Sequence, residues 1–258
     1  MLIFENELMS KHTTMKVGGP VDRMIVVDTE EELREVIDTG SFIIGNGSNV
    51  IFGDSGFRGT VIKINFNRIF MRGSDVVAGS GVMLHDLIAY CVYFDRSGPE
   101  CLAGIPGTVG GIVAMNAGFT RPVSSILRSV KVMNRFGKVS TISKEDMGFF
   151  YRGSVVKRDG LVIMEASFRT IPGSIKNEVS RLLDRRRTSQ PIYYPSSGSI
   201  FKRSGLKNFQ GWREGPAEVR GSYIINTGGA TAIDVLRLID RIRKEDTSLE
   251  LEVEVVGC

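Results

Sequence analysis

The chain has 258 residues, 42 % of them hydrophobic and 24 % charged, an ordinary composition for a soluble globular protein of one or two domains. Its net charge of +4 is too small to indicate nucleic-acid binding by itself, although it slightly favours a polyanionic small molecule. The sequence has no run of about 18 apolar residues, which excludes a membrane-spanning helix. The opening residues are acidic, unlike a secretion signal, and the three cysteines match neither a disulfide framework nor a metal site, so we expect a cytoplasmic protein.

Short strands and helices are predicted to alternate in the first part of the chain. Thr29 and Glu32 form a capping box that opens a helix, and a later amphipathic helix carries Leu84 and Leu87 on one face. Residues 130–142 have the pattern of a β-hairpin. The predicted strands are 22–27, 42–44, 60–64, 76–80, 130–134, 138–142 and 161–169, and the predicted helices are 29–37 and 83–94.

A boundary is predicted at Ile171-Pro172-Gly173. Beyond it, Ser174 can cap a helix that ends before Pro191, because proline disfavours helical structure at the residue before it. A second helix over 232–244 carries an apolar stripe, and a final strand over 249–256 alternates apolar and acidic residues. Together these elements predict an α+β fold.

Residues 104–118 are the most informative stretch of the chain. Five glycines and a proline interrupt an apolar run in which Asn116 is the only strongly polar side chain apart from the Thr108 hydroxyl. Glycine lets another group approach its backbone closely, and a glycine-rich turn can direct several N–H groups at one phosphate. A second glycine loop, 45–49, follows a predicted strand. Two such loops suit a ligand with two ends, such as a dinucleotide.

Neither loop matches the common nucleotide-binding motifs. The loop 45–49 lacks the third glycine of G-x-G-x-x-G and no clear helix follows it, which argues against a Rossmann site. The chain also lacks G-x-x-x-x-G-K-[ST], which argues against a P-loop ATPase. Taken alone, each loop is as consistent with an ordinary tight turn as with a phosphate site.

Six motifs in this order resemble one family, UDP-N-acetylenolpyruvoylglucosamine reductase, in a shorter type that lacks some substrate-domain loops. The motifs are 12–19, 45–49, 104–118, 151–154, 197–202 and 250–253. The resemblance implies a flavoenzyme of peptidoglycan precursor synthesis with an FAD-binding fold of the vanillyl-alcohol-oxidase type. It implies an FAD-binding domain over 1–170, made of two α+β subdomains divided near residue 56. A smaller α+β substrate-binding domain is implied over 171–258.

The resemblance also implies that the two glycine loops hold FAD, with NADPH as the reductant and no metal. Some proteins of this fold class bind flavin covalently through histidine, but this chain has only His12 and His85. His85 lies beside an amphipathic helix stripe, where a surface or packing role is expected, so we expect non-covalent FAD. The residues implied to contact it are Gly45, Asn46, Gly47, Ser48, Asn49, Ile105, Pro106, Gly107, Thr108, Gly110, Gly111, Asn116 and Gly118.

Three residues match catalytic positions of the family. Arg152 corresponds to the arginine that stabilises an enolate, and Ser199 corresponds to the serine that protonates it. Periodicity places Glu250, Glu252 and Glu254 on one strand face without choosing among them. The resemblance implies Glu252, because the second glutamate of the matching family motif is the catalytic one. Without the resemblance, these residues would be interpreted as a surface arginine, a turn serine and a solvated strand face.

Basic residues are expected to bind the diphosphate of a UDP-sugar. Three consecutive arginines end the helix before Pro191, and at most two of them can reach one diphosphate, so we choose Arg187 together with Lys202. The family pattern is broken at Arg203-Ser204, where Asn-Pro is usual. It is broken again near Arg220, which lies near the place of a family histidine.

The main functional prediction is NADPH-dependent reduction of UDP-N-acetylglucosamine enolpyruvate to UDP-N-acetylmuramate through FAD. We expect a monomer that binds a UDP-sugar and neither nucleic acid nor membrane. An alternative is an FAD-dependent oxidase or dehydrogenase of the same fold that acts on a different small molecule, consumes oxygen and does not need Ser199. A third possibility is a non-catalytic UDP-sugar or nucleic-acid binding protein without flavin. The order of Arg152, Ser199 and Glu252 along the chain favours the first.

Overall fold

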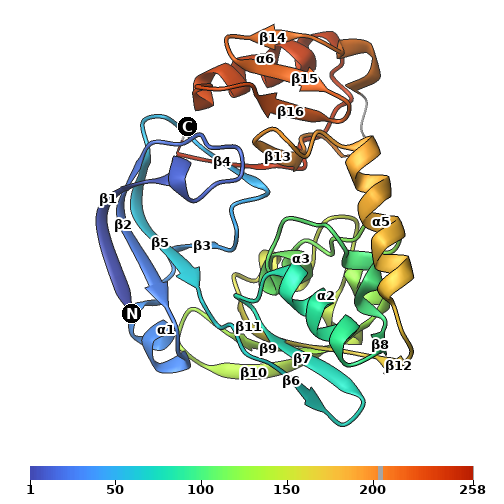
Figure 1. Cartoon of the computed structure of the whole chain (residues 1–258). Coiled ribbons are helices and arrows are strands. Elements are labelled where there is room, and N and C mark those ends of the chain that lie inside the picture. Colours follow the sequence, from blue (N-terminus) through green and yellow to red (C-terminus); the bar gives the residue numbers. More distant parts are fainter. Residues whose placement is uncertain (203–205, 258) are drawn as a thin grey trace. The chain divides into compact units, whose positions relative to one another are not determined.

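The computed structural model describes residues 1–202 and 206–257, which divide into two compact units (Figure 1). Unit 1 comprises Met1–Ile3, Ile25–Gly45 and Val61–Arg185, and unit 2 comprises Phe4–Met24, Asn46–Thr60 and Arg186–Cys258. Each unit is therefore assembled from three separate stretches of sequence. The functional division into 1–170 and 171–258 stays a prediction. Among the residues described, the helices are either too short or too polar to cross a lipid bilayer.

The N-terminal sheet has strand order β1-β2-β5-β3, with β3 parallel to β5. Its first strand is absent from the sequence prediction because its mostly exposed residues show no apolar alternation. Helix α1 (Glu30–Val36) begins as predicted, since Thr29 Oγ1 accepts a hydrogen bond of 3.2 Å from the N–H of Glu32. The strands are β1 (Leu2–Leu8), β2 (Pro20–Val27), β3 (Phe42–Ile44) and β5 (Phe57–Ile64).

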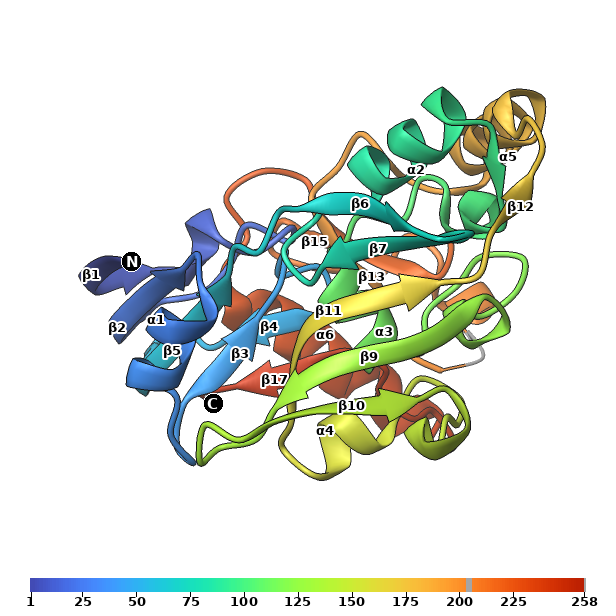
Figure 2. The same cartoon turned by 90° about the horizontal axis from the view of Figure 1, so that it is seen from below.

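A five-stranded antiparallel sheet of order β10-β9-β11-β7-β6 belongs to unit 1 (Figure 2). The predicted hairpin is confirmed, since Val139 pairs with Met133 across its turn. Apolar residues of α2 (Leu84–Tyr93) and α3 (Val109–Ala114) share one buried cluster with residues of this sheet. The strands are β6 (Ile69–Arg72), β7 (Asp75–Gly79), β9 (Leu127–Met133), β10 (Val139–Ser143) and β11 (Val162–Phe168).

The remaining elements of unit 1 are short apart from α5 (Lys176–Ser189), which is the helix predicted before Pro191. Its residues up to Arg185 belong to unit 1, and those from Arg186 belong to unit 2. The short elements are β8 (Arg96–Ser97), β12 (Ile171–Pro172) and α4 (Val155–Arg158). The 3-10 helices of the described residues are Met9–Lys11, Pro99–Leu102, Val123–Ser125, Glu145–Met147 and Leu206–Phe209.

Unit 2 contains a four-stranded antiparallel sheet of order β13-β16-β15-β14 and the helix α6 (Ala232–Glu245) (Figure 1). Thr231 and Asp234 form a capping box at the start of α6. The carboxylate of Asp54 accepts hydrogen bonds of 2.8 Å from the first two N–H groups of the helix, which suits its electropositive N-terminus. The strands are β13 (Ser196–Ser199), β14 (Arg213–Glu214), β15 (Ala217–Arg220) and β16 (Tyr223–Asn226).

The predicted final strand over 249–256 is wrong in its extent. Only β17 (Glu254–Val256) is continuous, and it pairs in parallel with β4 (Val50–Phe52). Further upstream, Leu251 forms an isolated bridge with Phe201. The chain bends at Val253 because this segment leaves one pairing partner for another. The strict alternation of the sequence therefore spans two short pairings rather than one strand.

Candidate functional site

The two glycine loops approach each other at Gly45 and Thr108 within unit 1. A Cβ at Gly45 would lie 2.5 Å from Thr108 Oγ1, so this position has no room for a side chain. Thr108 is the N-cap of α3, and its Oγ1 accepts a hydrogen bond of 3.4 Å from the N–H of Gly111. The sequence predicted only a turn here, because glycines within a helix lower its predicted propensity.

Many N–H groups of the run 104–118 donate inside the protein. The N–H of Ile105 donates to the carbonyl oxygen of Leu102, and the N–H of Gly107 donates to that of Ile105. The N–H of Gly110 donates to the carbonyl oxygen of Ser80. Gly110 packs tightly as well, because a Cβ there would lie 2.9 Å from Ser80 Cβ. Close packing thus explains this glycine, and the N–H groups that donate inside the fold are not directed at a ligand.

The loop 45–49 differs from the run 104–118 in how its backbone N–H groups are used. Gly47 has a φ of +61°, and a Cβ at this position would overlap the carbonyl oxygen of His12. Within the described part of the chain, the N–H groups of Gly47 and Ser48 donate to no acceptor. Successive N–H groups in such a turn form a concave anion site. The role of this loop in phosphate binding stays a prediction, for which these two N–H groups are available.

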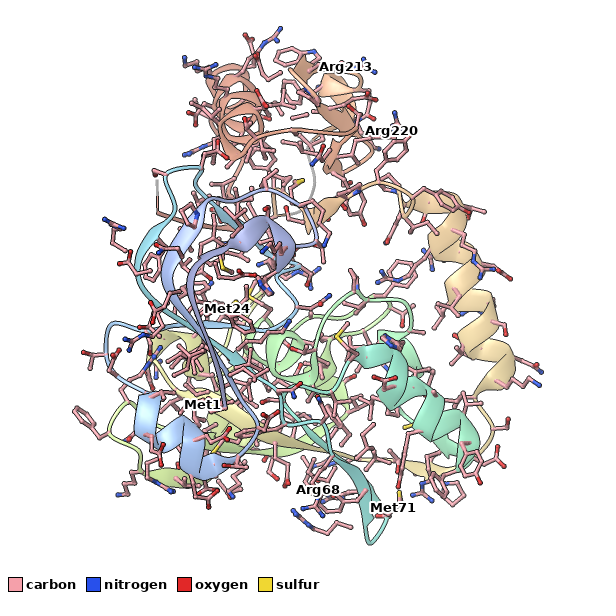
Figure 3. All side chains as sticks on the ribbon, turned by 60° about the vertical axis from the view of Figure 1, so that its left-hand side comes forward. Met1, Met24, Arg68, Met71, Arg213 and Arg220 are labelled. Carbon is pink, nitrogen blue, oxygen red and sulfur yellow. The ribbon has the colours of Figure 1, made fainter. Side chains whose placement is uncertain are left out.

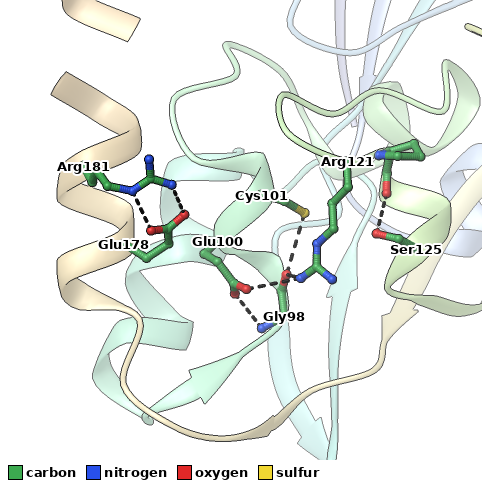
Figure 4. Close-up of polar contacts among 8 residues, drawn as sticks. Gly98, Glu100, Cys101, Arg121, Ser125, Glu178 and Arg181 are labelled. Atoms are coloured by element: carbon green, nitrogen blue, oxygen red, sulfur yellow. Dashed lines mark hydrogen bonds and ion pairs between the residues drawn. The ribbon is translucent and has the colours of Figure 1, made fainter. Parts of the chain in front are cut away.

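A polar network closes the base of the run 104–118 (Figure 4). Arg121 Nη2 donates to the Gly98 carbonyl oxygen at 2.9 Å and to Glu100 Oε1 at 3.2 Å. The other oxygen of Glu100 accepts from the Gly98 N–H at 2.6 Å. At Gly118 a Cβ would overlap the carbonyl oxygen of Arg121. The residues before and after the run are thus fastened together, which fixes the loop that they enclose.

Asn116 links this run to the loop that carries Arg152. Its Nδ2 donates to the carbonyl oxygen of Phe150 at 3.2 Å, and its Oδ1 accepts from the N–H of Ser124 at 3.3 Å. Phe150 and Gly153 exchange backbone hydrogen bonds around a tight turn. Arg152 sits in this turn with a φ of +59°, which is uncommon for a residue with a side chain. Unit 1 therefore brings together two predicted site residues, Asn116 and Arg152.

Ser199 ends β13 in unit 2, beyond a β-bulge. Ser196 pairs with Ile225, whereas Ser199 pairs with Tyr223, so the bulged strand carries one more residue than its partner. Gly198 occupies the bulge with a φ of +72°. The family resemblance implied a catalytic role for Ser199, whereas the residues alone indicated a turn, and no role was predicted for Tyr223. The bulge places these two side chains opposite each other on one face of the sheet.

Glu252 is held beside the same strand. Its N–H donates to the carbonyl oxygen of Ile200 at 2.8 Å, and its own carbonyl oxygen accepts from Asn49 Nδ2 at 3.1 Å. Its neighbour Glu250 forms an ion pair of 3.1 Å with Lys202 instead. The contacts thus distinguish the two glutamates, which periodicity could not. The loop 45–49 reaches this region through Asn49.

The three consecutive arginines of α5 have different surroundings. In unit 1, the Arg185 guanidinium lies 5.1 Å from the ring centre of Phe119. In unit 2, Arg186 is only 8 % exposed, and its Nη1 donates to Gln190 Oε1 at 3.1 Å. Burial lowers the pKa of Arg186, and its charge acts on the phenol of Tyr223. Arg187 is exposed.

Arg186 was not predicted, but its position carries a signal. It follows Val179 and Leu182 at helical spacing, so it continues the apolar stripe of α5. A charged residue on an apolar stripe is rare unless it has a specific partner. A search for such interruptions would have found it.

Arg220 has structural partners on β15 and before β13. Its Nη2 forms an ion pair of 2.8 Å with Glu218, and its guanidinium lies 4.5 Å from the ring centre of Tyr194. Arg213 binds the same carboxylate, and Figure 3 labels both arginines. These two cations hold the pKa of Glu218 below its ordinary value. The other departure, Arg203-Ser204, lies outside the described residues.

The two histidines have ordinary surroundings. His12 Nε2 lies 2.9 Å from Glu7 Oε1, and the side chain of His85 is exposed beside Asp86. The surface role expected for His85 agrees with this exposure. Among the described residues, histidines, cysteines and carboxylates form no cluster that could hold a metal ion.

Comparison with known proteins gives the family. Residues 20–143 match a family model described as an FAD binding domain. The chain is 37 % identical to UDP-N-acetylenolpyruvoylglucosamine reductase of Clostridium novyi (strain NT), over 99 % of this chain and 92 % of that protein. The chain belongs to the UDP-N-acetylenolpyruvoylglucosamine reductase family. A relative of the same name from Clostridium tetani is also 37 % identical, over 98 % of this chain and 91 % of that protein.

A crystal structure of the reductase of this family from Thermus caldophilus has the same fold. The two structures superpose with a TM-score of 0.89 at 32 % identity, over 99 % of this chain and all of that one. The predicted family, the FAD-binding fold and the class of FAD-dependent oxidoreductase are therefore confirmed. A flavin-free binding protein, the third possibility raised by the sequence, does not fit an FAD-binding domain.

Proposed function

We propose that this member of the reductase family reduces UDP-N-acetylglucosamine enolpyruvate to UDP-N-acetylmuramate with NADPH, as a monomer in the cytoplasm. One observation supports this proposal above the others. Ser199 and Glu252 lie on adjoining backbone segments of unit 2, and Asn49 of the glycine loop bonds directly to Glu252. Residues implied separately for proton transfer and for flavin binding thus share one unit.

The glycine loops fit a non-covalently bound FAD. The N–H groups of Gly47 and Ser48 suit a pyrophosphate oxygen, because they have no acceptor within the described part of the chain. Within unit 1, Gly45 approaches Thr108 of the other glycine-rich run closely. When bound, FAD supplies hydride chemistry, taking a hydride from NADPH and passing it to C3 of the enolpyruvyl group.

Three residues would complete the reduction on the substrate. Hydride addition at C3 leaves negative charge on C2, delocalised into the carboxylate as an enolate. Arg152 is proposed to stabilise this charge, since its planar guanidinium suits a carboxylate. Ser199 is proposed to give its hydroxyl proton to C2. We assign Glu252 to the same proton-transfer group.

Two basic residues, Arg187 and Lys202, are proposed to bind the diphosphate. Lys202 is paired with Glu250, which is itself highly exposed. An exposed ion pair contributes at most about 1 kcal/mol, so Lys202 can exchange this partner for a phosphate at little cost.

Anaerobic NADPH oxidation by the FAD-loaded protein, with and without the UDP-sugar, tests the proposal. We expect multiple turnovers that require the UDP-sugar. Ser199→Ala should leave flavin reduction by NADPH intact and slow flavin reoxidation by about 100-fold, as expected for loss of a general acid. Ser196→Ala, on the same strand, is the control. Equal impairment of both half-reactions would overturn the assignment of Ser199, and flavin that stalls after one reduction would overturn the substrate.

A further inference from the structure

Tyr223 is the residue that faces Ser199. The two residues are direct partners in the antiparallel pairing of β13 with β16 (Figure 1), so their side chains lie on the same face of the sheet. The extra residue at the bulge creates this pairing, because a regular register continued from Ser196 would place Ser199 opposite Ser222. The bulge thus brings a phenol rather than a second serine to Ser199.

The phenol of Tyr223 is partly buried and experiences two opposite charges. Arg186 and Glu252 both act on it electrostatically. Burial raises the pKa of Tyr223, so the phenol keeps its proton at neutral pH, while the charge of Arg186 acts to lower this pKa. The phenol is therefore a hydrogen-bond donor at neutral pH, and the charge of Arg186 stabilises the phenolate when the proton is lost.

We propose that Tyr223 is a positioning residue for Ser199, and that its hydroxyl donates to Ser199 Oγ and returns a proton to that oxygen after each turnover. The inference rests on the proposed function. A serine oxygen can accept one hydrogen bond while its own hydrogen stays available to another group. A donor at Tyr223 therefore leaves the Ser199 proton directed away from the sheet partner and ready for the substrate.

The proton steps balance as follows. The Ser199 O–H bond breaks as the C2–H bond of the substrate forms. The Tyr223 O–H bond then breaks as the Ser199 O–H bond is restored. The charge of Arg186 stabilises the resulting phenolate, which regains its proton from water. No oxidant or reductant is needed beyond those of the proposed reaction.

The test is a double-mutant cycle of Ser199→Ala and Tyr223→Phe, which keeps the ring and removes only the hydroxyl. Flavin reduction by NADPH and flavin reoxidation by UDP-N-acetylglucosamine enolpyruvate are followed separately under anaerobic conditions. We expect Tyr223→Phe to leave the first step unchanged and to slow the second by about tenfold, the typical value of one hydrogen bond. In the Ser199→Ala background the same change should have less than about a twofold effect, because its partner is already absent.

Further readouts separate this role from a structural one. The solvent deuterium isotope effect on reoxidation should increase in Tyr223→Phe, because proton delivery becomes slower. Tyr193→Phe is the matched control, since Tyr193 is 83 % exposed. Equal losses from Tyr223→Phe in both backgrounds, or no loss in either, would overturn the role of Tyr223 alone. A wild-type protein whose flavin is never reoxidised by the UDP-sugar would overturn the proposed function, and this role with it.

Discussion

The side-chain amide of Asn49 donates a hydrogen bond of 3.1 Å to the carbonyl oxygen of Glu252, and the carbonyl oxygen of Asn49 accepts one of 3.0 Å from the N–H of Glu254. Asn49 of the glycine loop thus bonds to the backbone at both Glu252 and Glu254. The first of these positions, Glu252, carries the acidic side chain proposed for proton transfer. The position of Glu252 therefore depends on the loop proposed to bind flavin.

Asn49→Ala removes the amide bond and keeps the backbone bond to Glu254. We expect flavin reoxidation by the UDP-sugar to slow by about tenfold and the free energy of unfolding to fall by about 1 kcal/mol, the usual value of one hydrogen bond. Half-reaction kinetics and urea unfolding measure the two effects. Asn67→Ala is the control, since Asn67 is exposed and its amide donates to the nearby Asn65 side chain at 2.6 Å. Loss of flavin affinity with normal reoxidation would mean that Asn49 serves the cofactor alone.

Gly47→Ala tests the close approach in the glycine loop. Gly47 and Gly73 both have a φ of +61°, but a Cβ at Gly73 would meet nothing within 4 Å. The backbone strain is therefore shared, whereas the overlap with the His12 carbonyl oxygen belongs to Gly47 alone. We expect Gly73→Ala to lower the free energy of unfolding by about 1 kcal/mol and Gly47→Ala to lower it by clearly more. Equal losses in urea unfolding would contradict the overlap.

Ser197→Ala should be neutral or stabilising. The side chain of Ser197 is fully buried, and its Oγ has no hydrogen-bond partner within the described residues. Removal of a buried unpaired hydroxyl is expected to raise the free energy of unfolding by up to about 1 kcal/mol. Ser154 is the matched control, because it is equally buried and its Oγ donates to the Ala114 carbonyl oxygen at 3.0 Å. Thermal unfolding should therefore show opposite signs for Ser197→Ala and Ser154→Ala.

The thiols of Cys91 and Cys101 should be unreactive in the folded protein. Burial raises the pKa of Cys91 from 9.0 to about 12 and also raises the pKa of Cys101. The thiolate is the reactive form, so an aromatic disulfide reagent at pH 8 should modify these residues only after unfolding. Peptide mapping by mass spectrometry measures the modification at each site. Rapid labelling of Cys91 in the native protein would contradict its burial.

The burial of the Cys91 thiol makes the free energy of unfolding depend on pH. In the unfolded chain the thiol of Cys91 loses its proton near its ordinary pKa, while the folded protein retains it. Its contribution to stability is therefore complete below about pH 9 and decreases as the pH rises from 9 toward 12. Cys91→Ala should make the free energy of unfolding less dependent on pH in this range. An unchanged slope would contradict the raised pKa.

Local periodicity was sufficient to predict several elements. The helix predicted over 83–94 is α2, and the helix predicted over 232–244 is α6, because buried residues recur at helical spacing in both. The hairpin of β9 and β10 was predicted because its turn residues separate two apolar runs. These elements depend on residues close in sequence, so the sequence alone carries their signal.

The relations within the candidate site depend on residues far apart in sequence. Tyr223 meets Ser199 only through the bulge at Gly198 and the register of β16, neither of which has a local periodic signal. The burial of Arg186 among three identical residues depends on how α5 packs. The sequence motifs predicted Ser199 and Glu252, and their shared unit became visible only in the structure.

Unit 2 combines stretches of the chain that are synthesised at very different times. Strand β4 is buried, yet its partner β17 is synthesised much later. Asn49 and Glu252 are 203 positions apart, and translation adds roughly 5–20 residues per second, so the wait is on the order of ten seconds or longer. During that time β4 presents an unpaired apolar edge, the kind of surface on which chaperones act and aggregates start. A nascent chain cut short before residue 254 would never cover it.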